Sequence, residues 1–285
     1  MEKLRASIVA YKTDPIQLNG VIDSFLNSSV TGTLTVFDNS PTDQLRQLCT
    51  GLKIEYIFNS ENVGYGKAHN MALAKSLDQS LYHLVLNPDV SFEPDALEKI
   101  FHFMEEHPQA GLAMPKVFSA EGQLQMLCKL LPTPFDLATR RFFPFDSWFE
   151  KLNARYEMRN TGYERVMNVP FLSGCFMFLR TNALKQVGLF DERFFLYAED
   201  TDLSRRLHEQ FLTLYFPGAE IRHVHARGSY KDFWLTMQNL KSAIQYFNKW
   251  GWFFDADRIA INQRAQMQVN IVGTPRMTLS EVKTA

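Results

Sequence analysis

The sequence has few cysteines and no excess of charge of either sign. Its three cysteines, Cys49, Cys128 and Cys175, lie far apart and form no CxxC pair, so neither a disulfide framework nor a structural zinc site is indicated. The 30 Lys and Arg residues are balanced by 31 Asp and Glu residues, which leaves no global basic field to hold nucleic acid. These absences exclude a general DNA-binding protein and favour a reducing compartment.

Long apolar runs are also missing. The longest strongly apolar, uncharged stretch, 166–179, is well short of the roughly 20 residues that a membrane-spanning helix needs. The apolar run that follows the N-terminal charges, 6–11, is too short for the core of a signal peptide. We expect no span and no export, and therefore a cytoplasmic protein, with contact at the inner face of the cell membrane still open.

Phenylalanine, in contrast, is abundant and unevenly placed. Seven of the 24 Phe residues precede residue 130 and seventeen follow it, together with all four Trp residues. With 46% hydrophobic residues in 285, the chain can build a large core, which accounts for part of these rings. The asymmetry divides the chain into a Phe-poor first part and a Phe-rich remainder.

The first 115 residues alternate β-type runs with helical patterns, which predicts an α/β domain with a mostly parallel sheet. The expected strands are 4–11, 33–37, 54–58 and 83–86, and the expected helices are 14–26, 67–77 and 95–106. The apolar stripe of the first helix is assigned to Ile16, Val21, Ile22, Phe25 and Leu26. Each strand delivers polar residues at its carboxyl end, where open α/β sheets bind ligands, so a nucleotide site is expected there.

The second half is less regular. Residues 132–148, rich in Pro and Phe and containing Arg140 and Arg141, are expected to form an irregular surface excursion. The elements expected after it are a strand at 169–179, helices at 181–187, 199–210 and 233–250, and a loosely ordered tail after residue 264. The helix at 233–250 is amphipathic and is expected to pack on the domain. Alternatively, residues 250–254 or 142–145 dip into an anionic membrane surface.

Two loops could contact a bound nucleotide. In Asn87-Pro88-Asp89, which follows a buried strand, a carboxylate could hold a divalent cation on a diphosphate, although the same residues make ordinary turns. Residues 62–70 place Gly64 and Gly66 between a strand and a helix, where backbone N–H groups could meet an anion. This loop is not a GxGxxG motif, because residue 69 is His, and an ordinary glycine-bearing loop explains it equally well.

Two further segments carry titratable groups. Residues 190–202 hold five carboxylates among aromatic side chains, where poor solvation raises basicity and suits one carboxylate to general-base work, while others cap a helix. His223 and His225 stand two apart on a predicted strand and point the same way, so they could form a metal pair, or one of them could simply be packed.

Taken together and in this order, the motifs resemble glycosyltransferase family 2, closest to the bacterial rhamnosyltransferases that build O-antigen and related surface polysaccharides. The resemblance covers roughly residues 4–255. The pieces that carry it are Ser7-Ile8-Val9-Ala10-Tyr11, Asp38-Asn39-Ser40, Asn62-Val63-Gly64 with Gly66 and Asn70, Leu86-Asn87-Pro88-Asp89, Ser173-Gly174, Gly188-Leu189-Phe190-Asp191-Glu192, Tyr197-Ala198-Glu199-Asp200-Thr201-Asp202-Leu203, and His225 followed by Ser229.

This resemblance implies a single α/β domain of the GT-A type, Rossmann-like, with a C-terminal amphipathic helical extension. Residues 1–115 would be the donor-nucleotide half, 116–230 the acceptor and catalytic half, and 231–285 the extension. It also implies roles for individual residues. Tyr11 and Asp38 would lie beside the nucleoside, and the nucleotide-sugar pocket would be shaped by Asn62, Gly64, Gly66, Asn70 and Asn87.

The remaining roles concern metal and catalysis. Asp89 would hold Mg²⁺ or Mn²⁺ with His225, for which His223 is the competing ligand. Asp200, paired with Glu199, would be the general base, and Gly174 and Asp202 would lie on the acceptor side. The family's first acidic metal position is Asn87 here, which puts the metal requirement in doubt.

The function implied is inverting transfer of a sugar, with dTDP-L-rhamnose as the favoured donor and a saccharide hydroxyl, free or lipid-linked, as the acceptor. UDP- or GDP-hexose donors stay open. A sugar-nucleotide pyrophosphorylase would need a glycine-rich basic loop after the first strand, where this chain has residues 11–15. A non-catalytic binding module is the other alternative, and it would not need Glu199, Asp200, Asp89 and His225 together.

Overall fold

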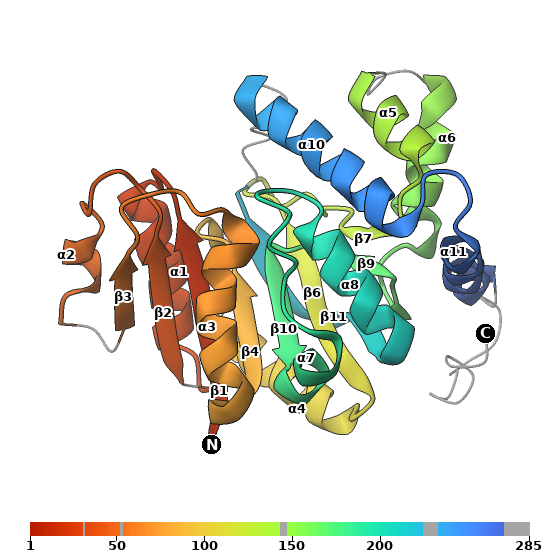
Figure 1. Ribbon diagram of the computed structural model, residues 1–285. Coiled ribbons are helices and arrows are strands. Elements are labelled where there is room, and N and C mark those ends of the chain that lie inside the picture. The colour runs from red at the N-terminus through yellow and green to blue at the C-terminus, as the bar shows by residue number, and fades with distance from the viewer. Residues whose placement is uncertain (31, 52–53, 143–146, 225–232, 271–285) are drawn as a thin grey trace.

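A nine-stranded mixed sheet forms the centre of the molecule in the computed structural model, which describes all residues except 31, 52–53, 143–146, 225–232 and 271–285 (Figure 1). The strand order is β3-β2-β1-β4-β10-β6-β11-β5, and β8 pairs with β11. The strands are β1 (Glu2–Ala10), β2 (Thr33–Asp38), β3 (Ile54–Phe58), β4 (Ser80–Leu86), β5 (Val90–Phe92), β6 (Ala110–Phe118), β8 (Met167–Asn168), β10 (Phe176–Arg180) and β11 (Leu212–His223).

Most of these strands run in one direction. Neighbours are parallel from β3 through β2 and β1 to β4 and again between β6 and β11, while β10 is antiparallel to both β4 and β6. A separate small sheet pairs β7 (Cys128–Lys129) with β9 (Phe171–Leu172). The predicted α/β fold with a mostly parallel sheet is therefore confirmed.

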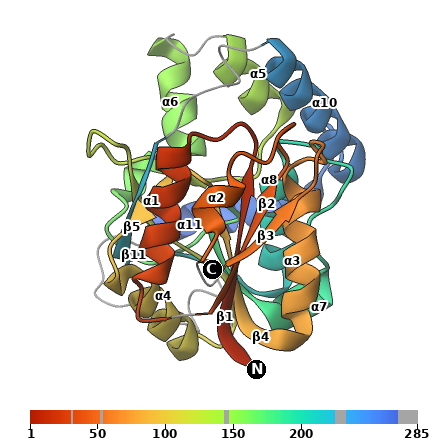
Figure 2. The same cartoon turned by 90° about the vertical axis from the view of Figure 1, so that its left-hand side faces the viewer.

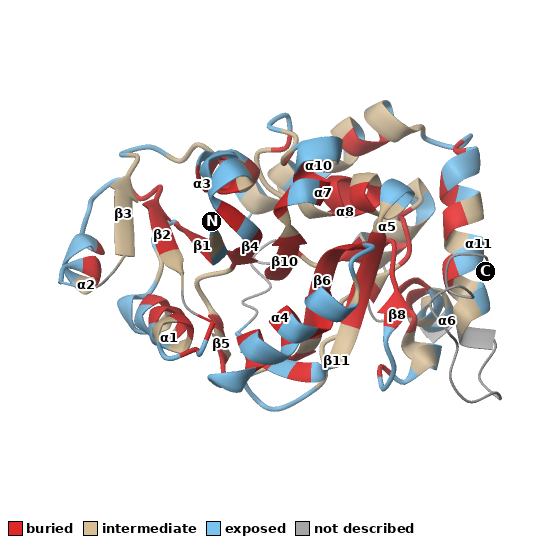
Figure 3. Ribbon diagram, turned by 90° about the horizontal axis from the view of Figure 1, so that it is seen from below, coloured by how far each residue is buried: buried red, intermediate tan, exposed pale blue. Residues whose placement is uncertain are grey.

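Helices cover both faces of the sheet, as the view along it shows (Figure 2). Helices α1 (Pro15–Leu26) and α4 (Asp95–Glu106) cover one face, and α3 (Tyr65–Gln79), α7 (Thr181–Val187) and α8 (Glu199–Gln210) cover the other. The short α2 (Arg46–Cys49) precedes β3. Seen from below, the central strands are mostly buried, and exposed residues gather on the outer sides of α1, α2 and α4 (Figure 3).

Local sequence explains how α1 begins and which side it buries. The side chain of Asp14 accepts a hydrogen bond from the Ile16 N–H and Pro15 occupies the first turn, which is the expected capping chemistry. The predicted stripe is wrong at Ile16, whose side chain is 81% exposed, whereas Leu18 is buried in its place. The spacing from Leu18 to Val21, Ile22 and Phe25 follows the helical period better.

Three further expectations need correction. Residues 132–148 are not irregular throughout, because helix α5 (Pro134–Phe142) lies within them and α6 (Ser147–Tyr156) begins there. Thr133 and Asp136 cap α5 reciprocally, each accepting a hydrogen bond from the other's N–H. The strand expected at 169–179 is interrupted between β9 and β10, and the tail continues as helix α11 (Ala256–Asn270).

Helix α10 (Phe233–Trp250) lies with α5 and α6 above the carboxyl ends of the strands (Figure 1). Its Tyr246 and Phe247 are buried against Phe194, so the expected packing on the domain holds for the end of the helix. It is wrong for the rest of the expected apolar face, which is at least 40% exposed at Phe233, Met237, Leu240 and Ile244. Helix α11 is fixed by Asn262, whose amide exchanges hydrogen bonds with the backbone of Leu131. Within the described residues, no helix is both long and apolar enough to cross a membrane.

Candidate active site

A cavity of about 400 Å³ lies below α10, at the carboxyl ends of the strands. Five residues that the sequence analysis singled out line it: Asn87, Gly174, Glu199, Asp200 and His223. Other walls come from the β7–β9 sheet, from α5 and from the pocket side of α10. This volume is typical of a small-molecule site.

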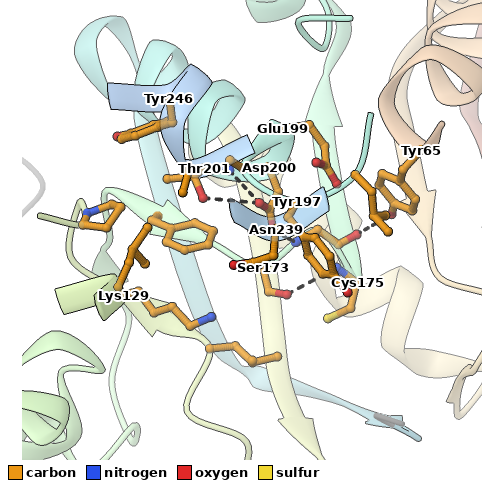
Figure 4. A pocket seen from close by; sticks show the side chains of 18 of the residues that line it. Tyr65, Lys129, Ser173, Cys175, Tyr197, Glu199, Asp200, Thr201, Asn239 and Tyr246 are labelled. Atoms are coloured by element: carbon orange, nitrogen blue, oxygen red, sulfur yellow. Dashed lines mark hydrogen bonds between the residues drawn. The ribbon is translucent and has the colours of Figure 1, made fainter. Parts of the chain in front are cut away.

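The pair Glu199-Asp200 is held in the cavity by an unusual turn at the start of α8 (Figure 4). Tyr197 and Ala198 both have left-handed backbone conformations, with φ of 70° and 65°. Such conformations cost on the order of 1–3 kcal/mol each in non-glycine residues and persist only where neighbours impose them. The neighbours here are Tyr65, whose N–H donates to the Phe195 carbonyl at 2.9 Å, and Ser242 of α10, whose hydroxyl donates to the Leu196 carbonyl at 2.7 Å.

Asp200 is oriented by backbone donors. The Gly174 N–H donates to Oδ2 at 2.9 Å, and the Thr201 N–H donates to Oδ1 at 2.7 Å. A Cβ atom on Gly174 would lie 3.1 Å from the Cβ of Asp200, so the absence of a side chain at Gly174 allows this approach. Each carboxylate oxygen retains a lone pair that could receive a substrate proton.

Glu199 differs from its neighbour. It is 5% exposed, and burial raises the pKa of its carboxyl well above the usual value, with the negative charge of Asp200 adding to the effect. Its Oε2 atom has no hydrogen-bond partner within the described part of the chain. The expectation that apolar surroundings raise the basicity of a carboxylate is thus confirmed for Glu199. Two adjacent carboxyl groups in unlike environments can serve opposite roles in proton transfer.

One end of the cavity contains a hydrogen-bond network around Asn87. The hydroxyl of Tyr65 lies 3.0 Å from Asn87 Oδ1 and 2.8 Å from the Gly174 carbonyl. The Nδ2 atom of Asn87 lies 3.4 Å from His223 Nε2. Burial, together with the charge of Glu199, raises the pKa of Tyr65, so its hydroxyl keeps its proton as a donor.

Gln125 orients the ring of His223. Its Nε2 donates to the His223 carbonyl at 2.7 Å, so its Oε1, 3.1 Å from His223 Nδ1, accepts the proton of that ring nitrogen. The other ring nitrogen, Nε2, then presents its lone pair 3.4 Å from Asp89 Oδ1. His223 Nε2 and Asp89 Oδ1 can both donate an electron pair to a metal ion, and their separation allows them to bind the same cation.

Protein side chains alone do not complete a metal centre, because no group of three or more His, Cys, Asp or Glu residues that could hold an ion occurs among the described residues. Mg²⁺ commonly binds one or two protein carboxylates together with substrate phosphates and waters, so the pair Asp89 and His223 is compatible with such a site. The favoured second ligand, His225, lies outside the described residues.

The glycine loop packs against the segment that precedes α8. A Cβ on Gly64 would lie 2.6 Å from the Phe195 carbonyl oxygen, and one on Gly66 would lie 3.0 Å from the Cβ of Phe190. The side chain of Asn70 exchanges hydrogen bonds with the N–H and carbonyl of Phe190. These three residues therefore hold the chain before α8 against α3, and none of them lines the cavity.

Three other predicted residues lie at the ends of β1 to β3. Tyr11 is 45% exposed after β1. Asp38 is fully buried, and its carboxylate accepts hydrogen bonds from the Tyr56 hydroxyl at 2.6 Å and the Ser40 N–H at 2.9 Å. The Oδ1 atom of Asn62 accepts from the Gly64 N–H at 3.1 Å. Asp38 and Asn62 thus shape the loops at this sheet edge, and Tyr11 is open to solvent.

Asp202 is not on the acceptor side, and that prediction is wrong. Its carboxylate is fully buried and accepts hydrogen bonds from Arg206 at 2.8 Å and Trp250 at 2.8 Å, with Lys249 at 2.6 Å. Helical periodicity explains the difference, because residues two apart on α8 point to different sides of the helix. Asp202 fastens α10 to α8.

The sequence analysis gave no role to Tyr65, Lys129 or Tyr246, all of which line the cavity. Tyr65 belongs to the glycine loop, so the motif already contained a signal for it. Lys129 belongs to the two-residue strand β7 and carries no motif, and its place emerges only from the pairing of β7 with β9.

Comparisons with known proteins agree with this arrangement. A family model described as Glycosyl transferase family 2 matches residues 17–188. The N-acetylglucosaminyl-diphospho-decaprenol L-rhamnosyltransferase of Mycobacterium tuberculosis is 28% identical over 211 residues, 68% of this chain and 67% of that protein. A low-salt glycan biosynthesis hexosyltransferase of Haloferax volcanii is 24% identical over 218 residues, 75% of this chain and 64% of that protein.

Solved structures support the fold. The crystal structure of GalNAc-T7 with UDP, GalNAc and Mn²⁺ has a TM-score of 0.57 at 11% identity and covers 78% of this chain and 43% of its own. That of Staphylococcus aureus TarS has a TM-score of 0.57 at 14% identity, over 98% of this chain and 46% of its own. This chain thus spans less than half of either structure, and the GT-A fold predicted from the sequence is confirmed.

Proposed function

Because this chain belongs to glycosyl transferase family 2, we propose that it is an inverting glycosyltransferase that moves L-rhamnose from dTDP-L-rhamnose to a hydroxyl of a lipid-linked saccharide. The observation that carries the proposal is the cavity in which Asp200, Glu199 and Gly174 meet the network of Asn87 and His223. The choice of donor and acceptor follows the name of the mycobacterial relative. Such a reaction would serve the synthesis of a cell-surface polysaccharide.

Asp200 is the general base in this proposal. Its carboxylate accepts the proton of the acceptor hydroxyl, which attacks the anomeric carbon on the side opposite the leaving nucleoside diphosphate and inverts the configuration there. The backbone N–H groups of Gly174 and Thr201 fix the carboxylate without neutralising it. The raised pKa of Glu199 favours its neutral form, which limits the negative charge close to the base.

The donor diphosphate lies at Asn87, Asp89 and His223, with Tyr11 beside the nucleoside. Asp89 and His223 would hold Mg²⁺ or Mn²⁺, and a divalent cation there would neutralise charge on the leaving diphosphate. The two halves, 1–115 for the donor and 116–230 for the acceptor, are functional divisions, because both contribute strands to one sheet.

The lipid part of the acceptor is suggested by the surface above the cavity. Phe233, Met237, Leu240 and Ile244 recur at helical spacing on α10 and are each at least 40% exposed. After the helix, Phe253 is 73% and Phe254 99% exposed. Residues 233–254 contain no Asp or Glu, and Lys241 is exposed among them, which favours an anionic membrane surface at the inner face of the cell membrane.

A panel of nucleotide sugars tests the donor. Unfolding temperatures are measured with dTDP-, UDP- and GDP-sugars, with and without Mg²⁺, because a ligand that binds only the folded state raises this temperature. The proposal expects a shift with dTDP-L-rhamnose and rhamnosyl transfer to a saccharide acceptor with inverted anomeric configuration. A shift with UDP or GDP sugars alone would contradict the donor assignment. Nucleotide binding without transfer to any acceptor would favour the non-catalytic alternative.

A further inference from the structure

The acceptor end of the cavity is lined by two cationic side chains, Lys129 and Arg140. Lys129 and Tyr65 lie on opposite sides of the pocket, and the Lys129 ammonium points into it (Figure 4). Tyr65 marks the donor end through its contact with Asn87. Lys129 thus lies across the cavity from the donor network (Figure 4).

Lys129 lacks the partner that a cation in such a place requires. Strand pairing sets it opposite Phe171, and its Nζ lies 4.9 Å from the centre of that ring. Its ammonium makes no hydrogen bond and no ion pair with the residues that the structure describes. Elsewhere in the molecule comparable cations are paired, as Arg205 is by two hydrogen bonds to Asp255. Withdrawing an unpaired ammonium from water is unfavourable, which points to an anion supplied from outside.

The neighbours of Lys129 do not supply that anion. Arg140 pairs with Glu157 at 2.7 Å, and Glu157 also pairs at 2.6 Å with Arg159, which has Glu150 as a second partner. Burial and then the charge of Arg140 lower the pKa of Lys129, and Asp200 and Glu157 act in the opposite direction. Asp200 is engaged with backbone N–H groups. No carboxylate among the described residues therefore forms an ion pair with Lys129.

We propose that Lys129, with Arg140 beside it, forms a subsite for a phosphate or diphosphate group of the acceptor, next to the sugar whose hydroxyl reaches Asp200. This inference rests on the proposed transfer to a saccharide acceptor. An ammonium and a guanidinium on one wall suit a group with more than one negative charge, and both donate charge-assisted hydrogen bonds to phosphate oxygens. The subsite would set the orientation of the acceptor and select acceptors that carry the anion.

The test compares three acceptors that share one accepting sugar. In the first the sugar is linked through a diphosphate to a short alkyl chain, in the second it is a neutral alkyl glycoside, and in the third it is linked to a uronic acid. The wild-type enzyme should have a KM for the diphosphate acceptor about 10- to 100-fold below that for the neutral one, which is the effect of one hydrogen bond to a charged group. Lys129→Met should bring the two KM values within about 3-fold, and Lys129→Arg should restore most of the difference.

The control is Lys151→Met, on the exposed surface of α6 and outside the cavity, which should leave the ratio unchanged. The KM for the donor should stay constant in all variants. An unchanged ratio in Lys129→Met would overturn the subsite, and a wild-type preference for the uronic-acid acceptor would overturn its assignment to phosphate.

A binding measurement separates this inference from the proposed function. Calorimetric titration of the diphosphate acceptor, with EDTA and without donor, should show binding to the wild type and at least about 10-fold weaker binding to Lys129→Met. If no donor supports transfer and this difference is nevertheless found, the function is wrong and the subsite stands. Equal binding to both proteins would refute the subsite whether or not transfer occurs.

Discussion

Replacing Asp200 by Asn tests the proposed chemistry most directly. The amide has the same shape, but it cannot accept a proton from the acceptor hydroxyl at neutral pH. Losing a general base typically slows a reaction about 10²- to 10⁴-fold. Donor binding should stay within about 2-fold of the wild type, because the proposed mechanism has Asp200 contact the acceptor and the KM for the donor reports a separate set of residues.

The structural cost of this substitution can be estimated from its contacts. Both carboxylate oxygens of Asp200 accept backbone hydrogen bonds, from Gly174 and from Thr201. The amide group of Asn must place its NH₂ against one of those donors, which leaves a donor unsatisfied and costs about 1–3 kcal/mol. The unfolding temperature should fall by about 2–4 °C for each kcal/mol.

The assay is release of nucleoside diphosphate in the presence of acceptor, followed with thermal unfolding of the same samples. Asp202→Asn is the matched control, since it changes the same residue type two positions away. It weakens the buried contacts with Arg206, Lys249 and Trp250 and should cost about 3–5 kcal/mol, because it leaves buried cations undercompensated. The molecules of Asp202→Asn that remain folded should still catalyse sugar transfer. Turnover of Asp200→Asn above a tenth of the wild-type rate would refute the assignment of the base.

Three other outcomes are expected. Gly174→Ala should lower kcat on the order of 10- to 100-fold in a steady-state assay, because its Cβ would lie 3.3 Å from the Oδ2 atom of the base and displace it. Stability to urea should fall as the pH drops below about 6.5, since burial lowers the pKa of His83 to about 3 and the unfolded chain then binds the extra proton, at about 1.4 kcal/mol per pH unit. Replacing Phe253 and Phe254 by Ser should reduce co-sedimentation with vesicles that contain anionic lipid at least about 10-fold.

Each of these three predictions has a control variant or an outcome that would contradict it. An unchanged kcat in Gly174→Ala would mean that the approach of this backbone to the base has no role in turnover. The acid effect should weaken in His83→Gln, and a urea midpoint that does not change between pH 7.5 and 5.5 would contradict it. Ile16→Ser, at an exposed apolar position on α1, should not change vesicle binding. If wild-type protein binds vesicles equally with and without anionic lipid, the proposed contact with an anionic membrane surface is wrong.

Helices and strands with regularly spaced apolar residues, or with a recognisable helix cap, could be predicted from the sequence. Helix α4 and strand β3 match their expected bounds, because each has a regular apolar pattern between turn residues. Helix α5 was missed because Thr133 and Asp136 form a cap with Asp where Glu or Gln is usual, amid Pro and Phe residues that suggest a loop. The break between β9 and β10 depends on the approach of Asp200 to Gly174, a tertiary contact that no local pattern encodes.

The candidate site, like the fold, could be predicted only where a local sequence motif marks its residues. The pair Glu199-Asp200 and the position of Asn87 come from short motifs at the ends of elements, and the structure brings them to one cavity. Motif membership does not reveal whether a residue faces a ligand or the protein. Gly64 and Asn70 belong to the same loop as Tyr65, yet they contact residues 190–195, and only Tyr65 reaches the cavity.

The hydroxyl of Tyr65 has one proton and two acceptors within reach, Asn87 Oδ1 and the Gly174 carbonyl. The amide of Asn87 is next to His223, and the N–H of Gly174 holds Asp200, so Tyr65 and the backbone of Gly174 connect the His223 side of the cavity with Asp200. A ligand that draws Asn87 away would release the proton fully to the Gly174 carbonyl. Occupancy of the two ends would then be thermodynamically linked, and each substrate would alter the affinity for the other by the same factor. Tyr65→Phe should bring that factor close to one.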